Sequence, residues 1–228
     1  MLQINMKKFK YIFDLDGTLY RFNKSSGGYF VKSQFYQDIK ENVYRFFAKE
    51  LKISRKQSIQ TYKKIMDEFK GEVSLGVEKT FGIDRYQYFS ATWNLDPEKY
   101  LEPNENLIPM IEPLSGNIAI LTSAPLVWAQ NALKFLGIDE YFKDAVFTGE
   151  GDIRKPNPEA FVQILKSFNC PSNEVFSIGD QEQTDILPAK NLGIKTIIVG
   201  SESAIADYSI KTISDFPALI KNIQKEIK

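Results

Sequence analysis

Two carboxylates near the start of the chain, Asp14 and Asp16, directly follow an apolar run in the segment KYIFDLDGTLYRF. Two acids this close together at the end of a buried strand cost free energy, through their mutual repulsion and through lost hydration. A divalent cation and a nearby lysine would relieve that cost and allow the two acids to take separate tasks. One carboxylate could attack phosphorus, while the other protonates the leaving oxygen and later deprotonates a water. Together with the polar groups described next, this spacing predicts carboxylate-based phosphoryl chemistry.

Three further groups of polar residues follow apolar runs in the same way. They are Thr122 and Ser123 after IAIL, Lys155 in RKPNP, and Asp180 with Asp185 in GDQEQTD. Carboxylates are ligands that Mg²⁺ prefers, whereas an ammonium group, hydroxyls and the amides of helix N-termini can hold a phosphoryl group. Each feature also has an ordinary interpretation: a helix cap for the two hydroxyls, a solvated loop lysine, and a turn for GDQEQTD. Their combination favours a site for phosphate and magnesium.

Five short apolar runs predict the strands that position these residues. Because the runs lack polar alternation, they suit a parallel sheet that is covered on both faces. Helical segments separate the later runs, and Asn157 and Gly193 are a predicted N-cap and a predicted C-terminal stop. This alternation predicts an α/β fold with a doubly wound parallel sheet, whose strand C-termini meet at one crevice. The predicted strands are 11–15, 117–123, 144–149, 174–180 and 194–200, and the predicted helices among them are 125–137, 157–168 and 184–193, with a closing helix at 214–227.

Residues 23–105 do not follow this rhythm and predict amphipathic helices, for example at 33–51. The segment starts just after the acidic pair and ends before the second predicted strand, so we expect it to insert at the C-terminal edge of the sheet. The predicted domains are therefore an α/β core formed by 1–22 and 106–228, and a helical cap formed by 23–105. The stretch NKSSGG at the start of the cap resembles a linker.

The composition excludes several functional classes. The 228 residues include 29 basic and 29 acidic side chains, so no basic field attracts a nucleic acid polymer. The chain has no histidine, which excludes a Ser-His-Asp triad, and no glycine-rich nucleotide-binding loop follows a predicted strand. No apolar run is long enough to span a membrane, and the N-terminal residues lack the apolar region of a signal peptide. With Cys170 as the sole cysteine, we expect a cytoplasmic protein without an intrachain disulfide.

At these residues the sequence resembles the haloacid dehalogenase-like superfamily of hydrolases. The segments DLDGTL, LTS, RKPNPEAF and GDQEQTD match its four motifs in order, and the resemblance covers residues 9–200. It implies a Rossmann-like core, Asp14 as the nucleophile that forms an aspartyl-phosphate, and Asp16 as the general acid and base. It also implies Mg²⁺ as cofactor, held by the Asp14 carboxylate, the Asp16 backbone carbonyl and Asp180. The remaining implied roles are phosphate binding by Thr122, Ser123 and Lys155, bracing of the turn by Thr18, and support of Lys155 or of metal-bound water by Asp185.

The resemblance implies a phosphatase for a small phosphate monoester, with a cap of the C1 type. Dehalogenation is disfavoured, because a halide leaving group needs no proton from Asp16. The helical cap looks like that of the pyrimidine 5′-nucleotidase-like branch, although Lys70 stands where that branch carries an aromatic residue. A nucleoside 5′-monophosphate is therefore one predicted substrate; the alternatives are phosphoglycolate, a sugar phosphate, or the reaction of a sugar phosphomutase. The turn at 69–77, with Lys70 and Gly71, is predicted to face Asp14 and to read the leaving group.

Overall fold

The computed structural model describes residues 9–22 and 32–226 of the chain. The chain divides into two compact units, one formed by the residues up to Arg21 together with those from Glu102 onward, and the other by Phe22–Leu101. We call these the sheet unit and the helical unit. The helical unit starts one residue earlier than the predicted cap of 23–105, and its last residue lies four residues before the predicted end. The predicted linker at 23–28 lies outside the described residues.

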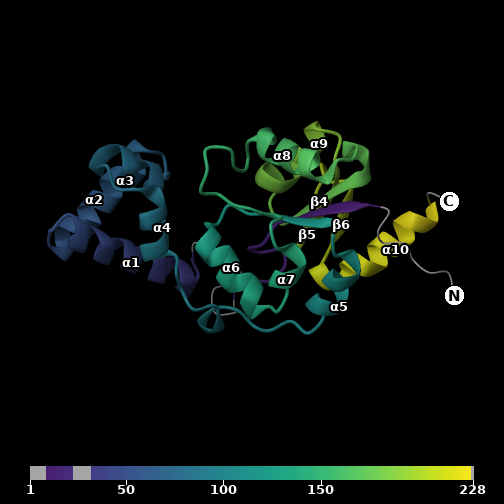
Figure 1. Ribbon diagram of the computed structural model, residues 1–228, viewed down its shortest axis with the longest axis horizontal. Coiled ribbons are helices and arrows are strands. Elements are labelled where there is room, and N and C mark those ends of the chain that lie inside the picture. Colours follow the sequence, from purple (N-terminus) through teal and green to yellow (C-terminus); the bar gives the residue numbers. More distant parts are fainter. Residues whose placement is uncertain (1–8, 23–31, 227–228) are drawn as a thin grey trace. The chain divides into compact units, whose positions relative to one another are not determined.

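The described part of the sheet unit contains six parallel strands in the order β3-β2-β1-β4-β5-β6 (Figure 1). The predicted α/β fold with a doubly wound parallel sheet is therefore confirmed. The chain adds β2 and β3 on one side of β1 and then returns to place β4 on the other side, so the strand order reverses at β1. The strands are β1 (Lys10–Phe13), β2 (Ile118–Leu121), β3 (Val146–Phe147), β4 (Val175–Gly179), β5 (Lys195–Val199) and β6 (Tyr208–Ile210).

Helices cover both faces of this sheet, as Figure 1 shows. Ile12 of β1 points to one face, where it belongs to an apolar cluster with Phe161 of α8 and Ala189 of α9. Phe13 points to the opposite face and contacts the ring of Phe216 in α10. Because successive side chains of a strand alternate between faces, burial on both sides explains why β1 is a continuous apolar run. The helices of this unit are α5 (Leu107–Ile111), α6 (Leu126–Phe135), α7 (Asp139–Phe142), α8 (Pro158–Phe168), α9 (Leu187–Asn191) and α10 (Phe216–Glu226).

Several elements of the sheet unit differ from the prediction, and the short helices α5 and α7 were not predicted. β3 is limited to Val146–Phe147, whereas the sequence predicted a strand over 144–149. β6 was missed, because a strand of three residues is too short for hydrophobic periodicity to reveal. The helix predicted at 184–193 begins as a π-helical turn, Glu182–Ile186, and continues as α9.

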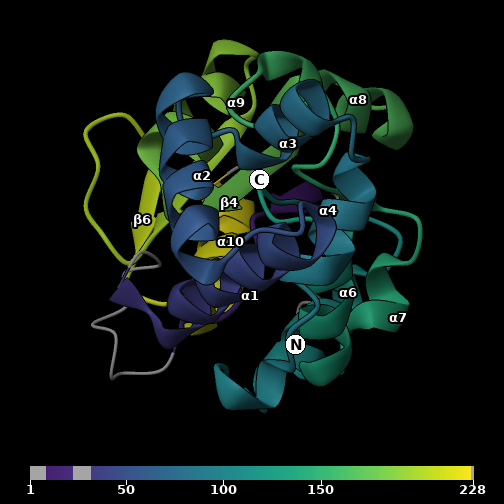
Figure 2. The same cartoon turned by 90° about the vertical axis from the view of Figure 1, so that its left-hand side faces the viewer.

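The helical unit contains four α-helices and a short 3₁₀ turn at Pro97–Lys99 in its described residues (Figure 2). Three of the helices start at a polar side chain that accepts hydrogen bonds from backbone amides: Ser33 for α1, Ser54 for α2 and Asp84 for α4. α1 packs against α2 and α4, and α3 also packs against α2 and α4. In neither unit is a described helix long and apolar enough to cross a bilayer. The bounds are α1 (Gln34–Glu50), α2 (Arg55–Glu68), α3 (Val73–Phe81) and α4 (Arg85–Thr92).

The segment 69–77, predicted as one glycine-bearing turn, is partly helical. Lys70 and Gly71 are exposed and form the turn between α2 and α3, with left-handed φ values of 50° and 91°. Gly76 lies inside α3, where an added Cβ would overlap the side chain of Ile65 in α2. Gly76 therefore allows the close packing of α2 and α3.

Candidate active site

The carboxylate of Asp14 lies just after β1 and contacts a buried lysine. Lys155 Nζ lies 2.6 Å from Asp14 Oδ1 and 2.5 Å from Asp185 Oδ1, and it donates hydrogen bonds to both. Lys155 comes from the loop between β3 and α8, and Asp185 comes from the π-helical turn after β4. Thr18, which was expected to brace the turn, donates from its hydroxyl to Asp14 Oδ2 over 2.9 Å. Both oxygens of Asp14 are therefore held by hydrogen bonds.

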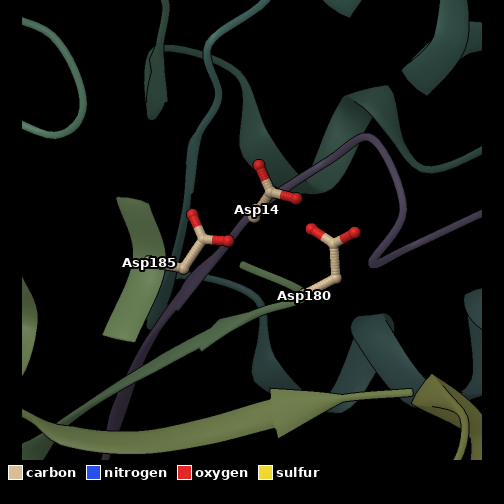
Figure 3. A group of neighbouring side chains, drawn as sticks. All are labelled: Asp14, Asp180 and Asp185. Atoms are coloured by element: carbon tan, nitrogen blue, oxygen red, sulfur yellow. The ribbon is translucent and has the colours of Figure 1, made fainter. Parts of the chain in front are cut away.

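Asp180, at the end of β4, brings a third carboxylate to Asp14 and Asp185. One oxygen from each acid lies within 4.8 Å of the others, and the three side chains converge in Figure 3. Two glycines make this approach possible. A Cβ at Gly17 would overlap the carboxylate of Asp180, and a Cβ at Gly179 would overlap that of Asp185. The acids can pack against the backbone at these points because no side chain is present.

Burial and crowding raise the pKa values of two of these acids. Burial is the largest cause for Asp14; Lys155 opposes it and the neighbouring carboxylates add to it, so that the pKa of Asp14 rises to about 8. Burial also raises the pKa of Asp180 to about 6, and the charge of Asp185 contributes. For Lys155, burial lowers the pKa, but the charges of Asp14 and Asp185 outweigh burial and raise the pKa above its ordinary value. The lysine is thus an ammonium group that cannot neutralise all of the acids around it.

The donor set of this cluster fits Mg²⁺. Carboxylate oxygens are the hard ligands that this cation takes. Oδ1 of Asp180 is buried and has no hydrogen-bond partner among the described residues, which is costly for a carboxylate. A cation held by Asp14 and Asp180 would satisfy that oxygen and offset the excess negative charge. Asp185 is already engaged, because its oxygens accept hydrogen bonds from Lys155 and, over 3.0 Å, from the backbone N–H of Gln181.

The side chain of Asp16 has a different environment. Its Oδ1 accepts hydrogen bonds from the hydroxyl of Tyr20 and, over 2.9 Å, from the indole N–H of Trp128. Its Oδ2 lies 3.4 Å from Oγ1 of Thr122. Burial raises the pKa of Asp16, although these donors oppose the shift. The Asp16 carboxylate is not part of the acidic cluster. The metal role expected of Asp16 would therefore fall to its backbone carbonyl, which directly precedes Gly17.

The loop after β2 carries the two predicted phosphate-binding hydroxyls. Thr122 is buried, and its Oγ1 accepts a hydrogen bond from the backbone N–H of Ala124 over 3.0 Å, the capping contact that the sequence also allowed. Ser123 is exposed. Gly149 follows β3, the strand that pairs with β2. It lies so close to the loop after β2 that a Cβ added at Gly149 would overlap the backbone carbonyl of Ser123. The backbone N–H of Gly149 also donates to the Ala124 carbonyl over 3.0 Å. The segment after β3 thus fixes the backbone of the loop that carries Ser123.

A family model described as haloacid dehalogenase-like hydrolase matches residues 11–199. The chain belongs to this family. The match includes every core residue discussed above, from Asp14 to Asp185, and the membership predicted from the four motifs is confirmed.

Relatives within the haloacid dehalogenase-like family are named as phosphatases. The pyrophosphatase PpaX of Halalkalibacterium halodurans is 32% identical over 114 residues, which cover 49% of this chain and 53% of the relative. The glyceraldehyde 3-phosphate phosphatase of Pyrococcus abyssi is 31% identical over 87 residues, which cover 38% of this chain and 37% of the relative. The chain thus spans about half the length, or less, of these curated relatives.

Solved structures of the family show the same fold. The crystal structure of a HAD phosphatase from Thermococcus onnurineus superposes with a TM-score of 0.64 over 93% of this chain and 97% of that one, at 21% identity. The likeness at this identity shows the fold alone.

Sequence reasoning missed several residues of this site. Tyr20 and Trp128 contact Asp16, but an aromatic side chain by itself signals only a buried core. The spacing of four residues between Asp16 and Tyr20 was a weak signal, whereas nothing in the sequence pointed from α6 to Asp16. Lys70 and Gly71 lie in the turn between α2 and α3 of the helical unit, and their role in specificity stays a prediction.

Proposed function

We propose that this chain is a Mg²⁺-dependent phosphatase that hydrolyses a small phosphate monoester through an aspartyl-phosphate on Asp14. The observation that carries the proposal is the buried cluster of Asp14, Asp180 and Asp185 around Lys155, with an unsatisfied oxygen on Asp180. Membership of a hydrolase family and the phosphatase names of the relatives support the same class.

In the first step, an oxygen of Asp14 forms a bond to phosphorus while the bond from phosphorus to the leaving oxygen breaks. Asp16 gives its proton to that leaving oxygen, so the product departs as an alcohol. Lys155 and Thr18 hold the two oxygens of Asp14, which fixes the rotation of the attacking carboxylate.

In the second step, a water gives a proton to Asp16 and attacks phosphorus, and the bond from phosphorus to Asp14 breaks to release phosphate. When bound, Mg²⁺ would neutralise negative charge on the phosphoryl oxygens. The residues proposed to hold it are Asp14, Asp180 and, through its backbone carbonyl, Asp16; those proposed to hold the phosphoryl group are Lys155, Thr122 and Ser123. Asp185 keeps the lysine in place through its hydrogen bond.

Substrate choice is proposed to come from the helical unit acting as a cap, because the residues of the sheet unit recognise only what all monoesters share. The predicted nucleoside 5′-monophosphate competes with a phosphorylated acid or sugar. The name of the Pyrococcus abyssi relative refers to a phosphorylated triose, which supports the second candidate. Lys70 offers a cation that could meet the carboxylate of a phosphorylated acid.

The experiment is a panel of phosphate monoesters, with pyrophosphate as an anhydride, assayed with Mg²⁺ and with excess EDTA. The panel contains a nucleoside 5′-monophosphate, glyceraldehyde 3-phosphate, phosphoglycolate, a hexose phosphate, pyrophosphate and an aryl phosphate. We expect hydrolysis of at least one monoester with Mg²⁺, its loss in EDTA, and its loss in Asp14→Asn. The matched control is Asp139→Asn, which removes an exposed carboxylate of α7 and should keep full activity. Hydrolysis that is unaffected by EDTA, or none on the whole panel, would refute the proposal.

A further inference from the structure

Asp16 accepts hydrogen bonds from two side chains that lie outside the four family motifs, Tyr20 and Trp128. The Tyr20 hydroxyl donates to Asp16 Oδ1, and the indole nitrogen of Trp128 lies 2.9 Å from that oxygen and 2.9 Å from the Tyr20 hydroxyl. Tyr20 is 6% exposed and Trp128 is 0% exposed. The three polar groups therefore form a closed triangle of hydrogen bonds within the sheet unit, in which the tyrosine and the tryptophan are buried and Asp16 is half-buried.

The backbone builds this triangle from two separate parts of the chain. The loop after β1 folds back on itself, since the N–H of Gly17 donates to the Tyr20 carbonyl over 3.0 Å and Asp16 and Tyr20 form a single β-bridge. Trp128 donates to the same oxygen from α6, although it follows Asp16 by 112 residues in the chain. Oδ1 is thus fixed from two directions by elements that are independent in sequence.

The chemistry of the donors distinguishes the two oxygens of Asp16. An indole N–H can only donate, and a phenol beside a carboxylate donates at neutral pH. Both of these donors are at Oδ1. Oδ2 has a longer contact of 3.4 Å to the Thr122 hydroxyl, at the start of the loop proposed to hold the phosphoryl group. Oδ2, which accepts no hydrogen bond from Tyr20 or Trp128, is therefore the oxygen on the side of that loop.

We infer that Tyr20 and Trp128 are positioning residues that anchor Asp16 by Oδ1, so that Oδ2 exchanges the proton with the leaving oxygen and then with water. This inference rests on the proposed role of Asp16 as general acid and base. Without the anchors the carboxylate can adopt other rotamers, and the productive orientation is populated for only part of the time. A structural role alone, in which the pair merely satisfies buried polar atoms, predicts a loss of stability with no dependence on the leaving group.

The experiment compares Tyr20→Phe and Trp128→Phe on an alkyl phosphate and on an aryl phosphate with a good leaving group, both with Mg²⁺. We expect kcat for the alkyl ester to fall by ~10-fold or more and kcat for the aryl ester to fall clearly less, because general acid catalysis matters most for poor leaving groups. KM should change little. The matched control is Tyr11→Phe, which removes a hydroxyl from an equally buried tyrosine of β1 and should leave both rates unchanged.

A second comparison places Tyr20→Phe in the Asp16→Asn background. If Tyr20 acts through Asp16, the added change lowers kcat no further than Asp16→Asn alone. Equal losses on both esters, or a further loss in the Asp16→Asn background, would overturn the inference. Because Tyr20→Phe removes only a hydroxyl, it decides the question even where Trp128→Phe fails to fold. If Tyr20→Phe leaves the rates unchanged while Asp16→Asn lowers them strongly, only the positioning role is refuted. If Asp16→Asn also leaves the rate unchanged, the proposed role of Asp16 as acid and base is refuted as well.

Discussion

Replacing Lys155 by methionine perturbs the electrostatics of the acidic cluster directly. The lysine side chain is 2% exposed, and its ammonium group lies 2.6 Å from Asp14 and 2.5 Å from Asp185. Methionine keeps much of the apolar stem but leaves these carboxylates buried without their cation. Removing one partner of a buried ion pair costs about 3–5 kcal/mol, and the loss here should lie toward the upper figure because two acids lose their partner. For a chain of this size the melting temperature should fall by about 6–20 °C.

The loss should also depend on pH. Lys155 lowers the pKa of Asp14, so its removal raises that pKa further above the present value of about 8. A carboxylate whose folded-state pKa exceeds its unfolded value of 3.8 ionises first in the unfolded chain, so it destabilises the fold increasingly as pH rises toward the folded-state pKa. Up to about pH 8 this cost is the same in both proteins, because Asp14 stays largely protonated in both folds, and above pH 8 it continues to grow only in Lys155→Met. The destabilisation by Lys155→Met should therefore be larger at pH 9 than at pH 5.

Urea unfolding in the presence of EDTA, at pH 5 and pH 9, measures this effect. The chain has two tryptophans, so a Trp93→Phe background leaves Trp128 as a fluorescent reporter of the sheet unit. The matched control is Lys166→Met in α8, because that lysine is 71% exposed and forms a surface ion pair of 3.4 Å with Glu159. The control should change the free energy of unfolding by less than about 0.5 kcal/mol. A loss below about 1 kcal/mol for Lys155→Met, or a loss that is greater at pH 5, would refute the reasoning.

Two further substitutions test the loops that surround the chemistry. Lys70→Ala should change the relative kcat/KM of nucleotide, sugar and carboxylate phosphates and affect an aryl phosphate much less; an equal loss on all substrates would show that this turn is structural. Gly149→Ala should lower kcat/KM on every substrate by ~10-fold or more, because the new Cβ displaces the backbone of Ser123. Its control is Gly151→Ala, whose Cβ would meet nothing closer than 3.9 Å, and similar activity in both variants would argue against a fixed phosphate loop.

Most of the fold could be predicted because its longer strands and helices are marked by patterns of neighbouring residues, such as apolar runs and helix caps. The apolar run of β1 and the cap at Asn157, whose side chain accepts a hydrogen bond from the Glu159 amide over 2.9 Å, are properties of neighbouring residues. The two residues of β3 and the three of β6 are held by pairing with longer strands, so their own sequence carries too little signal.

The acidic cluster could be anticipated for a topological reason. Asp14, Lys155 and Asp185 all follow strands of one parallel sheet, and the ends of such strands share an edge. Side-chain contacts that depend on how a helix is rotated could not be anticipated in this way. Trp128 has the same apolar setting in the sequence as any core residue of α6, and only its orientation in space brings its indole N–H to Asp16. Thr18, by contrast, lies only four residues after Asp14 in the same turn, where its hydroxyl donates to that carboxylate.

The proposed chemistry is tested most directly by trapping the phosphoryl group on Asp14. The protein is mixed with its best substrate and Mg²⁺, quenched, reduced with borohydride and digested, and the peptide that contains residue 14 is analysed by mass spectrometry. An acyl phosphate on Asp14 would be reduced to homoserine at that position, and we expect this product with Mg²⁺ but not with EDTA or in Asp14→Asn. With an aryl phosphate, whose leaving group needs little help from an acid, the signal should increase in Asp16→Asn, because the second step then lacks its base. Rapid turnover with an unmodified Asp14 under every condition would contradict the proposal.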